Sequence, residues 1–235
     1  VVNEISTAIS KVVSSTTLNY NKDIGANSIN FLLGYEAEKN ESKFSRATGT
    51  DLPASNLHTV ATAGEKDANG YSWGNSMISY LSRLEYNYDR KYYLSGSFRR
   101  DGSSKLGPAS RWGNFWSVAG AWSINKESFM NNVDAISNLR LRASYGVNGT
   151  LPPDDFGWRS LMGYSANYMS QAGGALLNIA DENLSWETNY ASDIALEFGL
   201  FKNRLYGTVE YFNRDSRNLL QSVPISRVTG FTEAL

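Results

Sequence analysis

Hydrophobic and polar residues alternate with a period of two along much of the chain. Between residues 139 and 147 every second position is Leu, Ala, Tyr or Val, and the positions between them include Arg140 and Arg142. Such alternation is typical of a β-strand that turns one face to an apolar medium and the other to water. The pattern recurs in residues 29–35, 78–88, 92–98, 116–124, 190–200 and 205–211.

A further strand is expected before Tyr20, although the pattern there does not define its phase. We therefore predict about eight antiparallel strands of about ten residues each. Strands of soluble proteins average about five or six residues, whereas about ten tilted residues are needed to cross a bilayer. The predicted fold is all-β and antiparallel, as in a segment of a transmembrane β-barrel.

The predicted connections alternate between short and long. Short turns are expected at residues 21–27, 89–91 and 201–203, and a medium connector at 126–138, where Phe129, Met130 and Val133 are spaced for one helical turn. Long loops are expected at 44–75, 101–113 and 150–186. Short turns on one side and long loops on the other are typical of an outer-membrane barrel with periplasmic turns and extracellular loops.

The two faces of the predicted strands differ in chemistry. The residues expected to face lipid are Tyr86, Trp116, Trp122, Leu141, Tyr145, Leu196 and Phe198. The residues expected to face the lumen are Arg83, Glu85, Arg140, Arg142, Asp193 and Glu197. Alternation alone fits a soluble β-sandwich equally well, but aromatic residues near strand ends favour a membrane interface.

Composition narrows the function classes. The 235-residue chain has a net charge of −1, which argues against nucleic acid as the main partner. It contains no Cys, so disulfides, thiolate metal sites and Cys nucleophiles are excluded within it. The start at Val1 has no basic region followed by an apolar stretch, so we expect no signal peptide there and expect the chain to be a piece of something larger.

Several blocks of sequence resemble a known family. Residues 97–104 (SFRRDGSS), 111–117 (RWGNFWS), 139–149 (LRLRASYGVNG), 182–188 (ENLSWET) and 198–205 (FGLFKNRL) resemble the barrel of SusC/RagA transporters, which are TonB-dependent outer-membrane proteins. The resemblance implies a barrel of about 22 strands, closed by an N-terminal plug, in the outer membrane of a Gram-negative bacterium. Residues 1–235 would then be a partial barrel domain without plug, N-terminal domain or C-terminal strands.

The resemblance also implies a function. The family imports oligosaccharides or peptides, uses energy from TonB with ExbB and ExbD, and pairs with a SusD-like surface lipoprotein that acts as a lid. On this interpretation the chain is not an enzyme. The alternatives are a passive porin or adhesin-type barrel of the outer membrane and a soluble carbohydrate-binding β-sandwich.

Candidate chemistry is sparse. His58 is the only histidine and lies in a predicted loop, and the Asp67–Gly70 and Asp154–Asp155 stretches lack the further carboxylates of a calcium loop. Gly102 and Gly107 are not followed by the Gly-Lys-Ser/Thr of a phosphate loop. We therefore predict no catalytic residue, no metal site and no cofactor. Lys105 and Arg111 are expected among outer-leaflet headgroups or lipopolysaccharide phosphates.

The long loop at 150–186 is the candidate substrate-binding segment. Trp158, Tyr164 and Tyr168 could stack on sugar rings, and Asn167 and Gln171 could hydrogen-bond to hydroxyl groups. In the alternative interpretation, these residues pack the loop onto its neighbours or onto the lipoprotein lid.

Overall fold

The computed structural model describes all residues except 165–167, 170, 172 and 235. Its main sheet has eight strands in the order β1-β2-β3-β4-β5-β6-β9-β10. These strands are β1 (Val2–Ile24), β2 (Asn27–Thr50), β3 (Glu65–Tyr88), β4 (Tyr92–Ser103), β5 (Trp112–Ser123), β6 (Ile136–Thr150), β9 (Glu187–Leu200) and β10 (Leu205–Arg217). Each strand pairs with its neighbour in sequence among these eight, which confirms the predicted all-β antiparallel segment of about eight strands.

Small elements lie between the long strands and after β10. They are the pairs β7 (Met162–Gly163) with β8 (Ala175–Leu176) and β11 (Val223–Pro224) with β12 (Glu233–Ala234), and the 3₁₀ turns η1 (Val60–Thr62), η2 (Ile124–Lys126), η3 (Ser128–Met130) and η4 (Arg227–Thr229). The turn η3 lies where the spacing of Phe129 and Met130 predicts one helical turn. In the described part of the chain, no helix is long and apolar enough to span a membrane.

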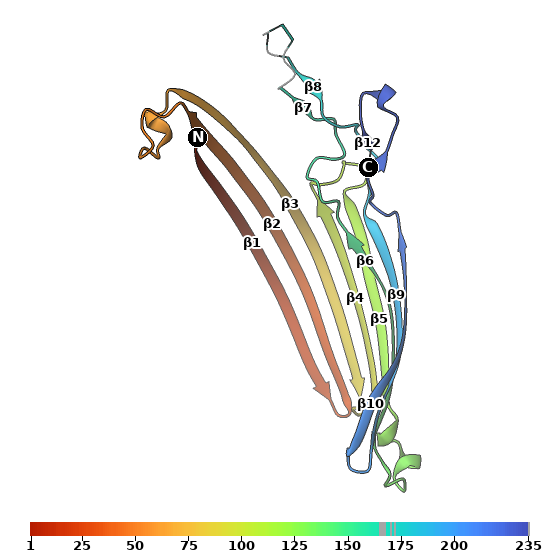
Figure 1. Ribbon diagram of the computed structural model, residues 1–235. Coiled ribbons are helices and arrows are strands. Elements are labelled where there is room, and N and C mark those ends of the chain that lie inside the picture. The colour runs from red at the N-terminus through yellow and green to blue at the C-terminus, as the bar shows by residue number, and fades with distance from the viewer. Residues whose placement is uncertain (165–167, 170, 172, 235) are drawn as a thin grey trace. The chain divides into compact units, whose positions relative to one another are not determined.

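The chain divides into two compact units, residues 1–14 with 37–77 and residues 15–36 with 78–235. In the second unit, short turns lie at one end of the strands and long loops at the other (Figure 1). The β3–β4 turn holds Asp89 and Arg90 in the left-handed region, at φ 50° and 52°. Two successive residues with positive φ form the mirror-image turn that suits the right-handed twist of a hairpin.

Two predicted loops are shorter than the sequence suggested. The loop expected at 44–75 is wrong over most of its length, because β2 continues to Thr50 and β3 begins at Glu65. Within the first unit the added rungs are held by polar and aromatic pairs: Asn40 Nδ2 donates to Asn75 Oδ1 over 3.0 Å, and Phe44 stacks on Tyr71 at 4.9 Å. The loop expected at 101–113 shortens in the same way, since β4 runs to Ser103.

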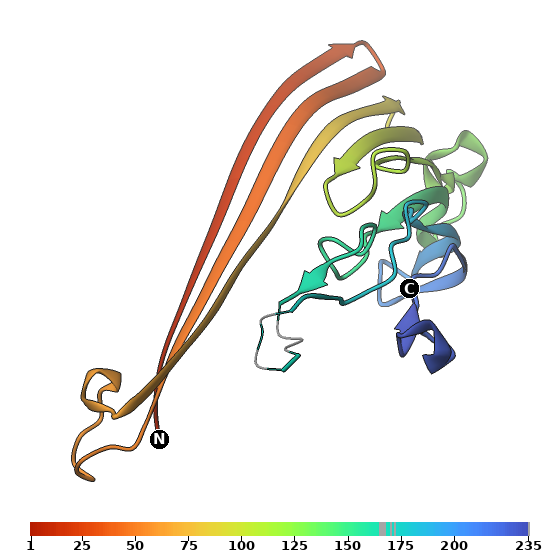
Figure 2. The same ribbon diagram turned by 90° about the horizontal axis from the view of Figure 1, so that it is seen from above.

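Strand register assigns the alternating residues to two faces. Leu141 lies opposite Trp122 on one neighbour and Leu196 on the other, and these side chains share one face. Arg140 lies opposite Glu197, on the other face. The strands β4 to β10 follow one another around an arc when viewed from above (Figure 2). The sheet does not close on itself, because β1 and β10 each pair with one strand only.

Candidate functional site

A small apolar core lies at the long-loop end of the second unit. Leu106, between β4 and β5, is 0% exposed, and Leu184, before β9, is 4% exposed. Phe115 packs edge-on against Trp186 with ring centroids 5.1 Å apart, and Trp186 Nε1 donates to the carbonyl of Arg111 over 3.2 Å. The loops at 104–111 and 151–186 are therefore folded onto each other.

Glycines make room for this core. A Cβ at Gly149 would lie 2.2 Å from the Phe115 ring and 2.9 Å from Trp186. Carbon atoms do not approach so closely, so the two aromatic side chains can pack there only because residue 149 has no side chain. The sequence motif from Arg111 to Ser117 thus contributes Phe115 and the Arg111 carbonyl to the base of the loops.

A charged contact, here called the loop clamp, joins the same two loops. Lys105 Nζ lies 3.3 Å from Asp155 Oδ1 and donates to the carbonyls of Pro152 and Pro153 over 3.2 and 2.9 Å. The side chains of Lys105 and Asp155 are 18% and 9% exposed. Lys105 is therefore half-buried between the two loops, with its ammonium group directed to Asp155 and two carbonyls, and its expected place among headgroups is wrong.

The predicted substrate-binding residues separate into two groups. Trp158 is half-buried at the loop base, where its Nε1 donates to the carbonyl of Ser104 over 3.3 Å and Arg159 lies 4.3 Å from its ring centroid. Tyr164 and Tyr168 are 78% and 75% exposed beyond the β7–β8 pair. Gln171 is exposed and pairs through its backbone with Tyr168, and Asn167 lies outside the described residues.

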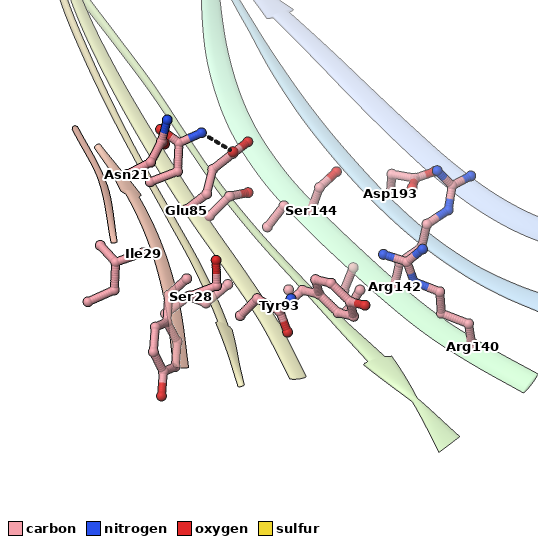
Figure 3. Close-up of a pocket in the computed structure, with 18 of the residues that line it drawn as sticks. Asn21, Ser28, Ile29, Glu85, Tyr93, Arg140, Arg142, Ser144 and Asp193 are labelled. Carbon is pink, nitrogen blue, oxygen red and sulfur yellow. Dashed lines mark hydrogen bonds between the residues drawn. The ribbon is translucent and has the colours of Figure 1, made fainter. Parts of the chain in front are cut away.

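The polar face of the sheet carries a hollow of about 710 Å³. Figure 3 shows Glu85 on one side of it and Arg140, Arg142 and Asp193 on the other. Arg142 is within 3.4 Å of Glu197 and 3.0 Å of Glu210, and Arg140 lies 4.9 Å from the Tyr93 ring centroid.

The hollow brings together most of the residues predicted to face a lumen. Arg83 joins this face through its ion pair with Glu85 at 2.5 Å. Charges of both signs occur here, so the face suits uncharged polar or zwitterionic groups better than a strongly charged ligand.

The apolar face has aromatic contacts near both strand ends. At the short-turn end, Tyr92 stacks on Trp122 at 6.5 Å, and both donate to Glu127 Oε1, over 2.5 and 3.0 Å. The hydrogen bond from Tyr92, followed by that from Trp122, holds the pKa of Glu127 below its usual value. Such amphipathic aromatic rings with polar partners are typical of a membrane interface.

Among the described residues, no group of three or more His, Cys, Asp or Glu side chains is arranged to hold a metal ion. The arrangement offers two binding surfaces instead: a polar, concave sheet face and an exposed loop arm above a packed base. Sequence reasoning missed the loop clamp, because it joins segments that are about 50 residues apart, a separation that no local pattern reports.

The sequence of the chain matches a family of known proteins. The family model described as "TonB dependent receptor-like, beta-barrel" matches residues 6–233. The chain belongs to the TonB-dependent receptor β-barrel family. The resemblance of this TonB-dependent receptor segment to SusC/RagA proteins is confirmed by its relatives and structural neighbours.

This TonB-dependent receptor segment is 31% identical over 231 residues to TonB-dependent receptor P26 of Formosa agariphila, a match that covers 94% of this chain and 23% of that protein. It is 30% identical over 220 residues to TonB-dependent receptor SusC of Bacteroides thetaiotaomicron, covering 90% of this chain and 22% of SusC. The chain thus spans about a quarter of the length of these relatives.

The fold of the segment also matches solved structures. The structure of the RagAB peptide transporter superimposes with a TM-score of 0.92 at 24% identity, over 99% of this chain and 26% of that chain. A structure of the RagAB peptide importer in the "open-open" state gives a TM-score of 0.88. These likenesses establish the barrel-type fold of the segment.

Proposed function

We propose that this chain is part of an outer-membrane transporter that imports oligosaccharides or peptides. The observation that carries the proposal is the family match over residues 6–233. The two-faced sheet supports it, because an apolar face with Leu141 and Leu196 suits lipid and a polar face with Arg140 and Asp193 suits a lumen. Import of a bulky solute through such a barrel requires selective binding and energy rather than catalysis.

TonB, with ExbB and ExbD, would supply that energy, and a SusD-like lipoprotein would close over the loops. The packed loop base supports the part of the proposal that concerns the lipoprotein lid, because it offers a fixed surface at the loop end of the strands. The Phe115–Trp186 contact and the loop clamp hold the base of the 151–186 loop in place, while Tyr164 and Tyr168, on the arm beyond it, are exposed. We propose that Tyr164, Tyr168 and Gln171, with Asn167, meet substrate on that arm, and that Trp158 supports them from the base.

An uptake assay tests the proposal. The full-length protein is expressed in its host, and uptake of labelled oligosaccharides and peptides is compared in cells with and without TonB. Uptake that depends on both the protein and TonB is the expected result. Uptake that continues without TonB would contradict active transport and favour the passive porin. Extraction of the protein without detergent would contradict a membrane barrel and favour the soluble sandwich.

A further inference from the structure

Arg99 and Arg100 are consecutive residues of β4 with different surroundings. Arg99 Nε bonds to Asp101 Oδ1 over 2.7 Å, and its Nη2 donates to Ser79 Oγ over 3.0 Å. Arg100 points to the opposite face and is exposed, with its Cζ 5.2 Å from the ring centroid of Trp112. Within the described residues, Arg100 has no carboxylate within ion-pair distance.

Arg100 lies beside an aromatic ladder formed by Tyr35, Tyr80 and Trp112. The Tyr35 and Tyr80 ring centroids are 5.5 Å apart, and those of Tyr80 and Trp112 are 6.2 Å apart. Trp112 reaches across β4 because residue 102 is glycine: a Cβ at Gly102 would lie 2.8 Å from the indole ring. The glycine of the Asp-Gly-Ser-Ser motif thus holds the indole next to Arg100.

The register places this arginine at the edge of the apolar band. Arg100 lies opposite Asn114 and follows Phe98, which pairs with Trp116, as the next residue on the same face of β4. At the other end of β4, the pair Tyr92 and Trp122 lies on this face too. From Tyr92 to Arg100 the strand rises about 26 Å at about 3.3 Å per residue. With the usual strand tilt this is about 20 Å along the membrane normal, comparable to an apolar band of about 25 Å.

We propose that Arg100, held against Trp112, binds a phosphate group of an anionic lipid in the outer leaflet. The proposal rests on the assignment of the apolar face to the membrane and does not depend on what is transported. A guanidinium group offers a planar fork of N–H donors that matches phosphate oxygens, and it is weakly hydrated. Stacking on an indole fixes its plane and leaves its donor edge available.

Charge complementarity favours a phosphate over a protein carboxylate. The nearest acidic residue in sequence, Asp101, is buried and already bonded to Arg99. The exposed neighbours on the apolar face are Tyr80, Trp112 and Asn114, which carry no charge. An unpaired cation among neutral amphipathic side chains, at headgroup depth, suits a phosphate-bearing lipid.

The test uses the full-length protein in non-ionic detergent, titrated with diphosphoryl lipid A and followed by native mass spectrometry. Arg100→Gln is expected to weaken lipid A binding about fivefold, as for an exposed charged contact. Arg100→Lys is expected to give an intermediate loss, because it keeps the charge but loses the fork. Gly102→Val is expected to weaken binding while Arg100 remains, because it displaces Trp112.

Arg83→Gln serves as the matched control, since Arg83 is an exposed arginine of the polar face paired with Glu85. It is expected to leave lipid A binding unchanged, and a large excess of inorganic phosphate is expected not to displace the lipid. Wild-type binding by Arg100→Gln, or an equal loss in Arg83→Gln, would overturn the proposal. Displacement by inorganic phosphate would overturn it in favour of a free-phosphate site. Failure of the face assignment itself is detected separately, by spin labels at residues 143 and 144.

Discussion

Lys105 and Asp155 form an ion pair of 3.3 Å between two loops, and both side chains are largely shielded from water. The contact holds the base of the 151–186 loop, beyond which Tyr164 and Tyr168 are exposed. A partly buried pair with additional carbonyl acceptors contributes more than a surface pair, since its loss leaves polar groups without their partner.

Lys105→Met is expected to destabilise the loop base by about 1–3 kcal/mol. Hydrogen–deuterium exchange of the full-length protein should show faster exchange in residues 104–111 and 151–160. Lys39→Met is the matched control, because Lys39 and Glu41 are 67% and 51% exposed in their 2.6 Å pair. Its cost should be below about 0.5 kcal/mol, and equal effects of the two substitutions would argue against the clamp.

Gly149→Ala is expected to disturb the Phe115–Trp186 contact. The added Cβ overlaps the Phe115 ring, and overpacking of this kind costs about 1–3 kcal/mol. The comparison is Gly96→Ala, where the nearest atom to the added Cβ is 3.9 Å away. Thermal unfolding should show a lower Tm for the first variant only. A similar Tm for both variants would mean that the loop core relaxes to accept the methyl group.

The contact of Glu127 with Tyr92 and Trp122 predicts a pH dependence. The folded-state pKa of Glu127 is lowered, so its stabilising contribution is present above the unfolded pKa of about 4.3 and is lost as pH falls through the folded pKa. Glu127→Gln should therefore lower Tm at pH 7, and the difference from wild type should shrink at pH 3. A difference that stays constant between these pH values would show that the carboxylate charge is not involved.

The sequence predicts the structure well where hydrophobic and polar side chains alternate with a period of two along a strand. Leu141 and Arg142 had to lie on opposite faces once the segment was a strand, and the phase of β4 to β10 followed in the same way. The outer parts of β2 and β3 were missed because residues 38–49 and 65–75 are polar on both sides. These outer residue pairs of β2 and β3 are held by backbone pairing and by polar contacts such as Asn40–Asn75. Such contacts produce no hydrophobic pattern in the sequence.

The candidate site was only partly predictable. The alternation placed Arg140, Arg142 and Asp193 on one face, and the strand register has them on one face; that this face lines a lumen stays a prediction. The surroundings of Lys105 were not predictable, since they depend on a contact between loops that are about 50 residues apart, and those of Arg100 depend on a side-chain contact with Trp112 on the adjacent strand. Lys105 is half-buried against Asp155, whereas Arg100, which the pattern did not single out, lies exposed beside Trp112.

We propose that one face of the sheet meets lipid and the other a watery lumen. Ala143 and Ser144 are consecutive residues of similar size on opposite faces, opposite Ile194 and Asp193 respectively. This segment contains no Cys, so a single cysteine at either position can carry a spin label once any cysteines elsewhere in the full-length protein are replaced. The most direct measurement is the accessibility of that label to oxygen and to a water-soluble nickel chelate in reconstituted membranes. The label at 143 is expected to collide with oxygen and the label at 144 with the nickel chelate, and the reverse result, or equal exposure of both labels to the chelate, would contradict the account.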